Sequence, residues 1–404
     1  MKHNSNLDIL RGLAALLVFL FHFNGSKDFD PIFSSKFSLY YNFPGGLAVL
    51  VFFILSGYVI GLTTPVLTSG PLIRKYLVKR AVRIMPIYIV VILFTAYLGN
   101  YSFGTVLSNL LFLNIPLCNL MNDAGPIWSL HFEVLFYLLF VPISLFRISL
   151  GKIVTGLLAI IIILFVFFHN VNIPPLIISY LVGLLFWISG TWIAGLKSLP
   201  RWNISGFRIM AVFLLMFSLQ SFNPYGLLVK SLNFTMIQYS NPWYHFRIFY
   251  FTMYFYPFVV LLILSAARLY TRWNVYLYYF LIATASLRLL LILKMYGIRY
   301  AFDNHYTIPV FFLLLSIFLW LINKDFSLGI SKVLKSTAWL SNISYALYVV
   351  HVPLIFVFGG IACGSSFIYS IKVVAYLVVL FGVSYLLEMK YQPFIRKKIN
   401  GKVV

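Results

Sequence analysis

The sequence has very little charge, and acidic residues are especially scarce. Only 9% of its 404 residues are charged, and Asp and Glu together number 8. A soluble domain of this length needs far more polar surface to cover its core, so a soluble enzyme is excluded. The chain is instead 62% hydrophobic with a mean hydropathy of +0.96, and apolar runs long enough to cross a bilayer recur throughout. We therefore predict a single polytopic, all-α membrane domain over residues 1–404, without a second soluble domain.

The apolar runs predict about 10–12 membrane spans. They lie near residues 7–24, 46–64, 84–100, 126–147, 152–170, 174–196, 205–222, 247–268, 275–294, 307–323, 338–359 and 367–389. With a cytoplasmic N-terminus, the outer side receives only Lys27, Lys36, Lys230, Arg247, Lys294, Arg299 and Lys372. The other Lys and Arg fall on the inner side, apart from Arg288 within a span, as the positive-inside rule requires. Both termini are therefore predicted to be cytoplasmic, and the net charge of +22 requires no nucleic-acid partner.

Cysteine is scarce as well. The 2 cysteines, Cys118 and Cys363, both fall in predicted outer loops. They are either unrelated small residues or a disulfide formed in an oxidising compartment. The sequence has no zinc-type spacing, no Gly-rich phosphate loop and no internal repeat. We therefore expect no metal site and no permanently bound cofactor.

The first span carries three polar side chains. In "LDILRGLAALLVFLFHF" (7–23), Asp8, Arg11 and His22 interrupt an apolar run. A helix turns about 100° per residue, which places all three along one stripe. Arg11 falls near the inner end and His22 near the outer end, roughly 16 Å apart. Polar groups are expensive at membrane depth, so the stripe is predicted to face a polar cavity.

The second stretch, "FFILSGYVIG" (52–61), contains the pair Ser56-Gly57. Small residues let two helices approach closely, so a packing notch is the favoured interpretation. In the third, "RKYLVKRAVRIMPIYIV" (74–90), Arg80 and Arg83 are one turn apart and run into the span. Paired guanidiniums there suit a phosphate-bearing ligand that enters from the cytoplasm. Pro86 is then expected in the first turn of the helix.

The fourth stretch, "GPIWSLHFEVLFYLLFVP" (125–142), places Glu133 inside a span. A carboxylate at membrane depth is a candidate functional group. His131 lies about 200° around the helix from it and is interpreted as a local packing or interfacial group. The fifth, "ISYALYVVHVPLI" (343–355), contains His351, for which a structural role is favoured over a functional one.

These stretches, taken in order, resemble the signatures of the acyltransferase-3 family of integral membrane O-acyltransferases. The first matches its Leu-Asp-x-Leu-Arg-Gly run with a His eleven residues after the Arg. The runs "FFILSGYVI", "KRAVRIMPIY", "WSLHFEVLFYL" and "ISYALYVVHVP" then follow where the family has its other signatures. Residues 150–330 are similar mostly in hydropathy. Leu50 stands where the family often has an acidic residue, and the expected form is the one without a C-terminal esterase-like SGNH domain.

The resemblance implies transfer of an acyl group, commonly acetyl, from a cytoplasmic CoA thioester to a hydroxyl of a carbohydrate, often an envelope glycan. It implies that His22 is catalytic, that Arg11 and Glu133 act with it, and that acyl-CoA is bound by Arg80, Arg83 and Arg11. Further accessory candidates are Asp8, Ser56, Trp128, Ser129 and His351. The expected partners are acyl-CoA, a glycan or glycolipid and the lipid bilayer of a bacterial inner membrane, and the oligomeric state is left open.

The mechanism predicted from the sequence uses His22 as a general base. Neutral His22 removes the proton of the acceptor hydroxyl as it attacks the thioester, and Glu133 orients His22 or stabilises its imidazolium. An acyl-imidazole intermediate is a less favoured variant. The alternative function is a transporter or flippase for a glycan-lipid or small solute, in which the intramembrane Arg, Glu and His form a proton relay. A structural scaffold ranks third, because it gives no reason to bury Glu133.

Overall fold

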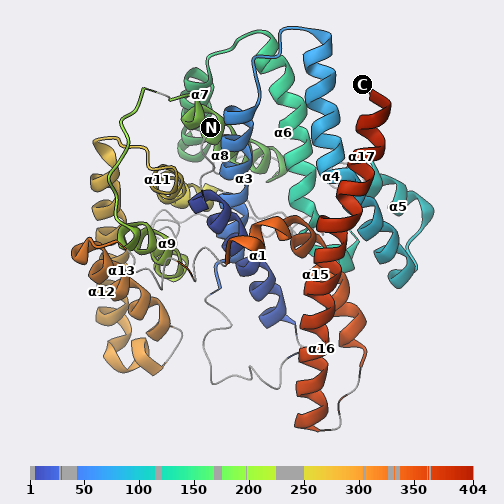
Figure 1. Cartoon of the computed structure of the whole chain (residues 1–404). Helices are drawn as coiled ribbons and strands as arrows, with labels where there is room; N and C mark the ends of the chain where they lie inside the picture. The colour runs from blue at the N-terminus through green and yellow to red at the C-terminus, as the bar shows by residue number, and fades with distance from the viewer. Residues whose placement is uncertain are drawn as a thin grey trace. The chain divides into compact units, whose positions relative to one another are not determined.

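In its described residues the computed structural model is almost entirely helical (Figure 1). It describes residues 5–26, 43–113, 121–167, 175–196, 198–223, 250–303, 306–325, 337–361 and 365–403, together with Phe29, Lys332 and Cys363. The chain divides into two compact units whose segments alternate along the sequence. The first unit comprises residues 1–10, 35–63 and 149–337, and the second comprises 11–34, 64–148 and 338–404.

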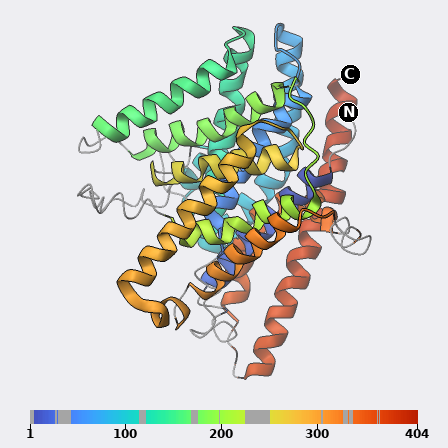
Figure 2. The same cartoon turned by 90° about the vertical axis from the view of Figure 1, so that its left-hand side faces the viewer.

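The first unit contains most of the middle of the chain. Its helices are α3 (Gly45–Thr63), α7 (Leu150–Phe167), α8 (Pro175–Gly195), α9 (Gly206–Ser221), η5 (Tyr250–Phe255), α11 (Tyr256–Ala266), α12 (Trp273–Asp303) and α13 (Thr307–Ile322). Helix α11 packs against α3, α8, α9 and α12, while α13 packs against α9 and α12. The pair α12 and α13, gold to orange, is clearest in Figure 2. Side-chain hydrogen bonds to backbone, such as Arg208 Nε to Trp320 O at 3.1 Å, tie α9 to α13.

Helices α3 and α8 touch backbone to backbone in the first unit. A Cβ atom at Gly57 would lie 1.8 Å from the carbonyl oxygen of Trp187, and one at Gly190 would lie 2.0 Å from that of Ile54. The hydroxyl of Thr191 donates to the carbonyl of Gly57 across the contact, at 3.1 Å. Only glycine fits at such an approach. The predicted packing notch at Gly57 is confirmed, and its partner glycine on α8 was not foreseen.

The second unit contains most of the polar residues singled out in the sequence. Its elements are α1 (Ser5–Gly25, from Arg11 onward), α4 (Gly70–Gly99), α5 (Phe103–Leu110), η3 (Asn122–Ile127), α6 (Trp128–Leu145), η6 (Ala338–Asn342), α15 (Ser344–Gly359), α16 (Ser366–Tyr385), η7 (Leu386–Tyr391) and α17 (Gln392–Val403). Helix α15 packs against α4, α16, η3 and η6 and is the centre of this unit. Helix α1 approaches η6 closely, because a Cβ at Gly12 would lie 2.9 Å from that of Leu340.

Helix α4 is longer than its predicted span. It begins at Gly70 rather than near residue 84, with Pro71 in its first turn, so the basic stretch is itself helical. The placement of Pro86 in the first turn was therefore wrong, because this proline lies inside the helix. Lys and Arg have long aliphatic stems and good helix propensity, so a basic segment can continue a membrane helix into the interface.

The last helix also continues beyond its predicted end. Helix α16 passes through the π-helical segment η7 directly into α17, shown as one red column in Figure 1. A π-helical turn accommodates one extra residue and changes the direction in which the following side chains point. This feature leaves no signal in hydropathy.

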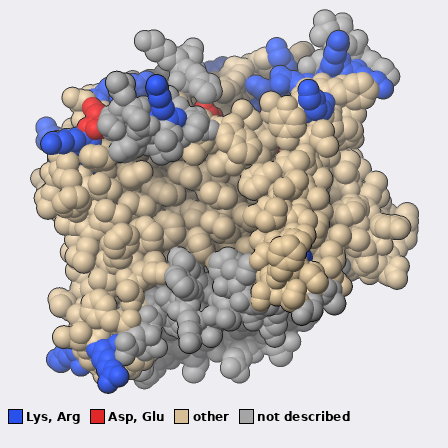
Figure 3. All heavy atoms as spheres, turned by 60° about the horizontal axis from the view of Figure 1, so that its bottom comes forward, with Lys and Arg blue, Asp and Glu red and all other residues tan. Residues whose placement is uncertain are grey.

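Length and composition of the helices agree with a membrane protein. In the described part of the chain, eight helices are long and apolar enough to cross a membrane, and four more are apolar with 10–17 residues. Each predicted span coincides with one of these helices, which confirms the predicted all-α polytopic fold. In the view of Figure 3 most of the described surface is free of Lys, Arg, Asp and Glu, as lipid contact requires.

Candidate active site

His22 lies on α1 and meets a second histidine from α15. Its Nδ1 atom is 2.9 Å from the carbonyl oxygen of Val18, one turn earlier, and 3.3 Å from Nε2 of His351. The two imidazole centroids are 5.1 Å apart. His22 is half-buried, whereas His351 is completely buried. The second unit thus brings together two histidines that are 329 residues apart in the sequence.

The hydrogen bonds of this pair define which ring nitrogens carry protons. A carbonyl oxygen only accepts, so Nδ1 of His22 donates to Val18. Nδ1 of His351 lies 3.0 Å from the carbonyl of Leu347 and donates there, which leaves its Nε2 as an acceptor. The one Nδ1–H of His22 is then shared between the Val18 carbonyl and Nε2 of His351. In neutral His22 the lone pair is therefore on Nε2. This is the nitrogen from which a general base acts.

His351 is held by its surroundings on α15 and α16. The hydroxyl of Tyr376 donates to the His351 carbonyl at 3.2 Å. The rings of Phe19 and Tyr348 meet the imidazole edge to face, with centroids 6.2 and 6.4 Å away. Packed aromatic neighbours restrict the rotamers of an imidazole, so His351 offers His22 a fixed acceptor.

Glu133 lies on the face of α6 that turns toward α15. One turn before it, the hydroxyl of Ser129 is 2.7 Å from that of Tyr348, which lies one turn before His351. Glu133 itself accepts a hydrogen bond from Tyr137. The contacts that orient His22 come from Val18 and His351. The predicted role of Glu133 beside the imidazolium stays a prediction.

Arg80 and the tyrosines around it form a second polar group. Its guanidinium lies 5.8 Å from the ring centroids of both Tyr76 and Tyr137, within cation–π range. The Tyr76 hydroxyl donates to the Tyr137 carbonyl at 3.2 Å, which fixes α4 on α6. Nε of Arg80 is buried without a hydrogen-bond partner among the described residues. A buried donor of this kind suits an anionic ligand.

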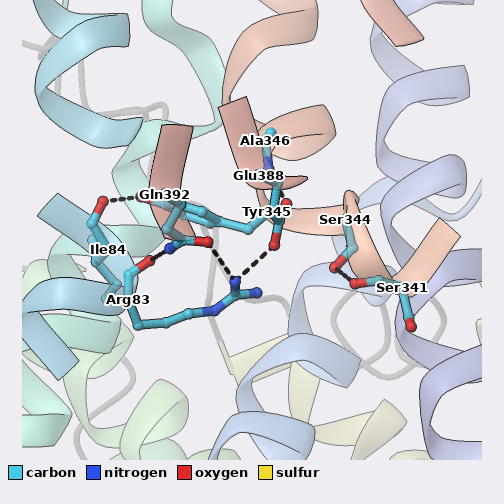
Figure 4. Close-up of polar contacts among 8 residues, drawn as sticks. All are labelled: Arg83, Ile84, Ser341, Ser344, Tyr345, Ala346, Glu388 and Gln392. Carbon is cyan, nitrogen blue, oxygen red and sulfur yellow. Dashed lines mark hydrogen bonds and ion pairs between the residues drawn. The ribbon is translucent and has the colours of Figure 1, made fainter. Parts of the chain in front are cut away.

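Arg83, one turn further along α4, is bound by the C-terminal helices (Figure 4). Nη1 of Arg83 donates to Oε1 of Glu388 at 2.7 Å and to Oε1 of Gln392 at 3.2 Å. Oε2 of Glu388 accepts from the backbone N–H of Ala346, in the first turn of α15, at 2.9 Å. The Arg83 side chain stays 40% exposed, whereas that of Glu388 is 3% exposed.

The other candidate residues from the sequence lie on α1, α6 and α3. Arg11 and Asp8 lie one turn apart on α1, and their predicted pairing stays a prediction. Trp128 begins α6 and packs edge to face on Phe132, with ring centroids 5.7 Å apart. Ser56 lies on α3, in the first unit, next to the packing notch.

His131 is a buried histidine that bonds the carbonyl of Phe112, as expected of a local packing group. The thiol of Cys363 contacts the carbonyl of Ile361 at 3.7 Å. Cys118 lies outside the described residues, so the predicted choice between a disulfide and two unrelated cysteines stays open.

Comparison with known proteins decides the family. A family model described as an acyltransferase domain matches residues 4–277, more than half of the chain. The chain belongs to the acyltransferase-3 family. Comparisons with curated proteins and with solved structures give no match. The protein is thus a membrane acyltransferase, and the resemblance inferred from five short stretches is confirmed.

Several polar residues of this acyltransferase-3 protein were missed by sequence reasoning. They are Tyr76, Tyr137, Tyr348, Glu388 and Gln392. The three tyrosines could not be distinguished in the sequence, because the chain has 28 tyrosines and most of them suit an interfacial aromatic belt equally well. Glu388 carried a usable signal, because it is one of only 8 acidic residues and lies within a predicted span. Both Glu388 and His351 lie beyond the part of the chain that the family model matches.

Proposed function

We propose that this acyltransferase-3 protein is an O-acyltransferase, specifically an O-acetyltransferase. It takes the acyl group from cytoplasmic acyl-CoA and transfers it to a hydroxyl of a carbohydrate, namely a cell-envelope glycan or its lipid-linked precursor. The observation that carries the proposal is the His22–His351 pair, which leaves the lone pair of neutral His22 on Nε2. A base of this kind is what an incoming hydroxyl needs.

The reaction proceeds by direct transfer. The acceptor oxygen attacks the thioester carbonyl carbon while Nε2 of His22 removes its proton. The carbon–sulfur bond then breaks, and the CoA sulfur receives that proton from His22. Between these steps His22 is an imidazolium whose Nδ1–H is bonded by Val18 and His351. These acceptors fill the place of the carboxylate in a Ser-His-Asp triad, and the negative charge of Glu133 stabilises the imidazolium.

The donor binds through its phosphates. Arg80 has a buried, unsatisfied Nε in the described part of the chain, and Arg83 keeps much of its side chain exposed. Both are on α4, which the distribution of Lys and Arg predicts to start at the cytoplasmic side. On α1, Arg11 lies about 16 Å before His22, a distance that an extended pantetheine arm spans. No resident cofactor is needed, since acyl-CoA is a substrate.

The family supports the location, and the charge pattern supports the orientation. We place the protein in a bacterial inner membrane as a multi-pass protein with both termini in the cytoplasm. Acyl-CoA is then met on the inner side, and the glycan acceptor on the outer side near His22. The bilayer is the third partner.

The proposal is tested with purified protein in lipid nanodiscs, given acetyl-labelled acetyl-CoA and an envelope glycan fraction. Label is expected to appear in the glycan, and His22→Ala should lower the rate by about 100-fold or more while binding of CoA in equilibrium dialysis is retained. Full activity of His22→Ala contradicts the base role. If acetyl-CoA is not consumed with any acceptor, the transporter alternative is favoured.

The same assay distinguishes direct transfer from an acyl-imidazole. Incubation with labelled donor alone leaves the protein unlabelled if transfer is direct. Label that remains on wild-type protein but not on His22→Ala indicates attack by His22 itself.

A further inference from the structure

Glu388 is an acidic side chain that the proposed reaction does not use. It lies on the π-helical segment η7, and its side chain is only 3% exposed. Burying a carboxylate is costly unless hydrogen bonds and charges compensate it. Both oxygens are compensated here, one by the Arg83 guanidinium and the other by the Ala346 N–H at the start of α15. Glu388 therefore connects α4, α15 and the C-terminal helix at one point (Figure 4).

These contacts fix one end of the Arg83 guanidinium. The two hydrogens of Nη1 are directed to Glu388 and to Gln392, and the amide of Gln392 donates in return to the Arg83 carbonyl. Tyr345 adds its ring 5.6 Å from the guanidinium and bonds the carbonyl of Ile84 through its hydroxyl. The guanidinium is thus held by Nη1 and by the Tyr345 ring.

The opposite edge of the guanidinium is left available. Among the described residues neither Nε nor Nη2 of Arg83 has a protein hydrogen-bond partner, and in Figure 4 both dashed lines from the guanidinium start at Nη1. The side chain is 40% exposed although its carboxylate partner is buried. The Nε–Nη2 edge has two parallel N–H groups, which is the geometry that binds two oxygens of one phosphate.

The two residues that bind Nη1 of Arg83 lie at the π-helical segment. Glu388 and Gln392 are four residues apart, on either side of the end of η7, and both reach Arg83. π-Helical turns are rare and occur often at functional sites.

We propose that Glu388 is a positioning residue that aims the free edge of Arg83 at a phosphate group of the acyl-CoA donor. The proposal rests on the proposed function. Glu388 acts through Arg83 and does not touch the donor. If only its charge mattered, the Glu388 carboxylate would repel the donor phosphate, and removing it would lower KM for acetyl-CoA. If Glu388 positions Arg83, removing it raises that KM.

The test compares two donors in wild-type protein and in Glu388→Gln. Acetyl-CoA carries the nucleotide phosphates, whereas S-acetylpantetheine lacks them. The amide keeps the size of the side chain but loses the charged hydrogen bond to Arg83. We expect KM for acetyl-CoA to rise about tenfold or more in Glu388→Gln, since one charge-assisted hydrogen bond is of this magnitude. With S-acetylpantetheine, both kcat and KM should be unchanged.

Other results overturn the proposal. Equal losses with both donors mean that Glu388 only connects the helices, and a lower KM for acetyl-CoA means that its charge opposes the donor. An unchanged KM for acetyl-CoA excludes any role. If wild-type protein transfers from neither donor, the proposed function itself fails, which is a separate result.

Three further variants complete the experiment. Arg83→Lys should raise KM for acetyl-CoA. Adding Glu388→Gln to it should raise this KM little further, because the two substitutions remove the same interaction. Gln392→Leu keeps the ion pair, and hence the fold, and should give a smaller rise confined to acetyl-CoA. Lys390→Gln is the matched control, since this exposed side chain is on the same segment and changes the charge by one. Its KM should equal that of wild type.

Discussion

A histidine in a membrane helix acts as a base only if one ring nitrogen keeps its lone pair and the other nitrogen is held. In this protein the local helix supplies one acceptor, the Val18 carbonyl, and a distant helix supplies the other, His351. The Val18 contact follows from the sequence, because a side chain four residues later can reach that carbonyl. The His351 contact does not, because it joins residues 329 positions apart.

His351→Phe tests this arrangement at the residue scale. The ring fills the space but offers no acceptor for Nδ1 of His22, so kcat should fall on the order of 100-fold at unchanged KM for the donor. His351→Gln keeps an acceptor oxygen and should recover part of the rate. Tyr376→Phe is the control, since it removes only the hydrogen bond to the His351 carbonyl. Equal kcat in His351→Phe and wild type contradicts the pairing.

Residues with a local signature could be named as candidates from the sequence, and those defined by tertiary contact could not. His22, Arg80, Arg83 and Glu133 were selected because polar groups at membrane depth are unusual. Glu388 has the same property, but its partner is 305 residues away in the sequence. The sequence could therefore supply candidates, while the pairing between them required the fold.

At the scale of elements, helix existence was predictable and helix ends were not. Hydropathy locates apolar runs, but it cannot show that α4 begins at Gly70 or that α16 continues into α17. Contacts between helices could be predicted from the sequence only where a small residue indicated a close approach. Gly57 is such a mark, and it lies where α3 touches α8.

Gly190→Ala tests the contact between α3 and α8. The new Cβ would lie 2.0 Å from the Ile54 carbonyl oxygen and 2.8 Å from the Tyr58 nitrogen, both backbone atoms that cannot move aside cheaply. We expect a loss of about 3 kcal/mol in unfolding free energy, seen as a thermal midpoint several degrees lower in detergent. Gly195→Ala on the same helix meets nothing within 4 Å and should leave the midpoint unchanged. Equal midpoints for both variants would contradict the close approach.

At the scale of the whole molecule, the distribution of Lys and Arg predicts which side faces the cytoplasm. Donor and acceptor are proposed to meet the protein from opposite sides, so this orientation is a condition for the reaction. It rests on the asymmetric distribution of the basic residues along the sequence.

Cysteine labelling tests the orientation directly. Cys363, in a Cys118→Ser background, should react with a membrane-impermeant maleimide on right-side-out vesicles. Ser149→Cys in a cysteine-free background is the matched control, since this exposed residue lies in a predicted inner loop. It should react only after permeabilisation. The reverse pattern would invert the topology and with it the proposed route of the donor.

We propose that His22 of this acyltransferase catalyses O-acylation of an envelope carbohydrate. Mass spectrometry of the envelope glycans measures this in cells that lack the gene and are complemented with wild-type protein or with His22→Ala at equal membrane levels. We expect an added acetyl mass on a glycan with wild-type protein, and no added mass with His22→Ala or with empty vector. Glycans that are identical in all three strains, or acetylated equally by His22→Ala, would contradict it.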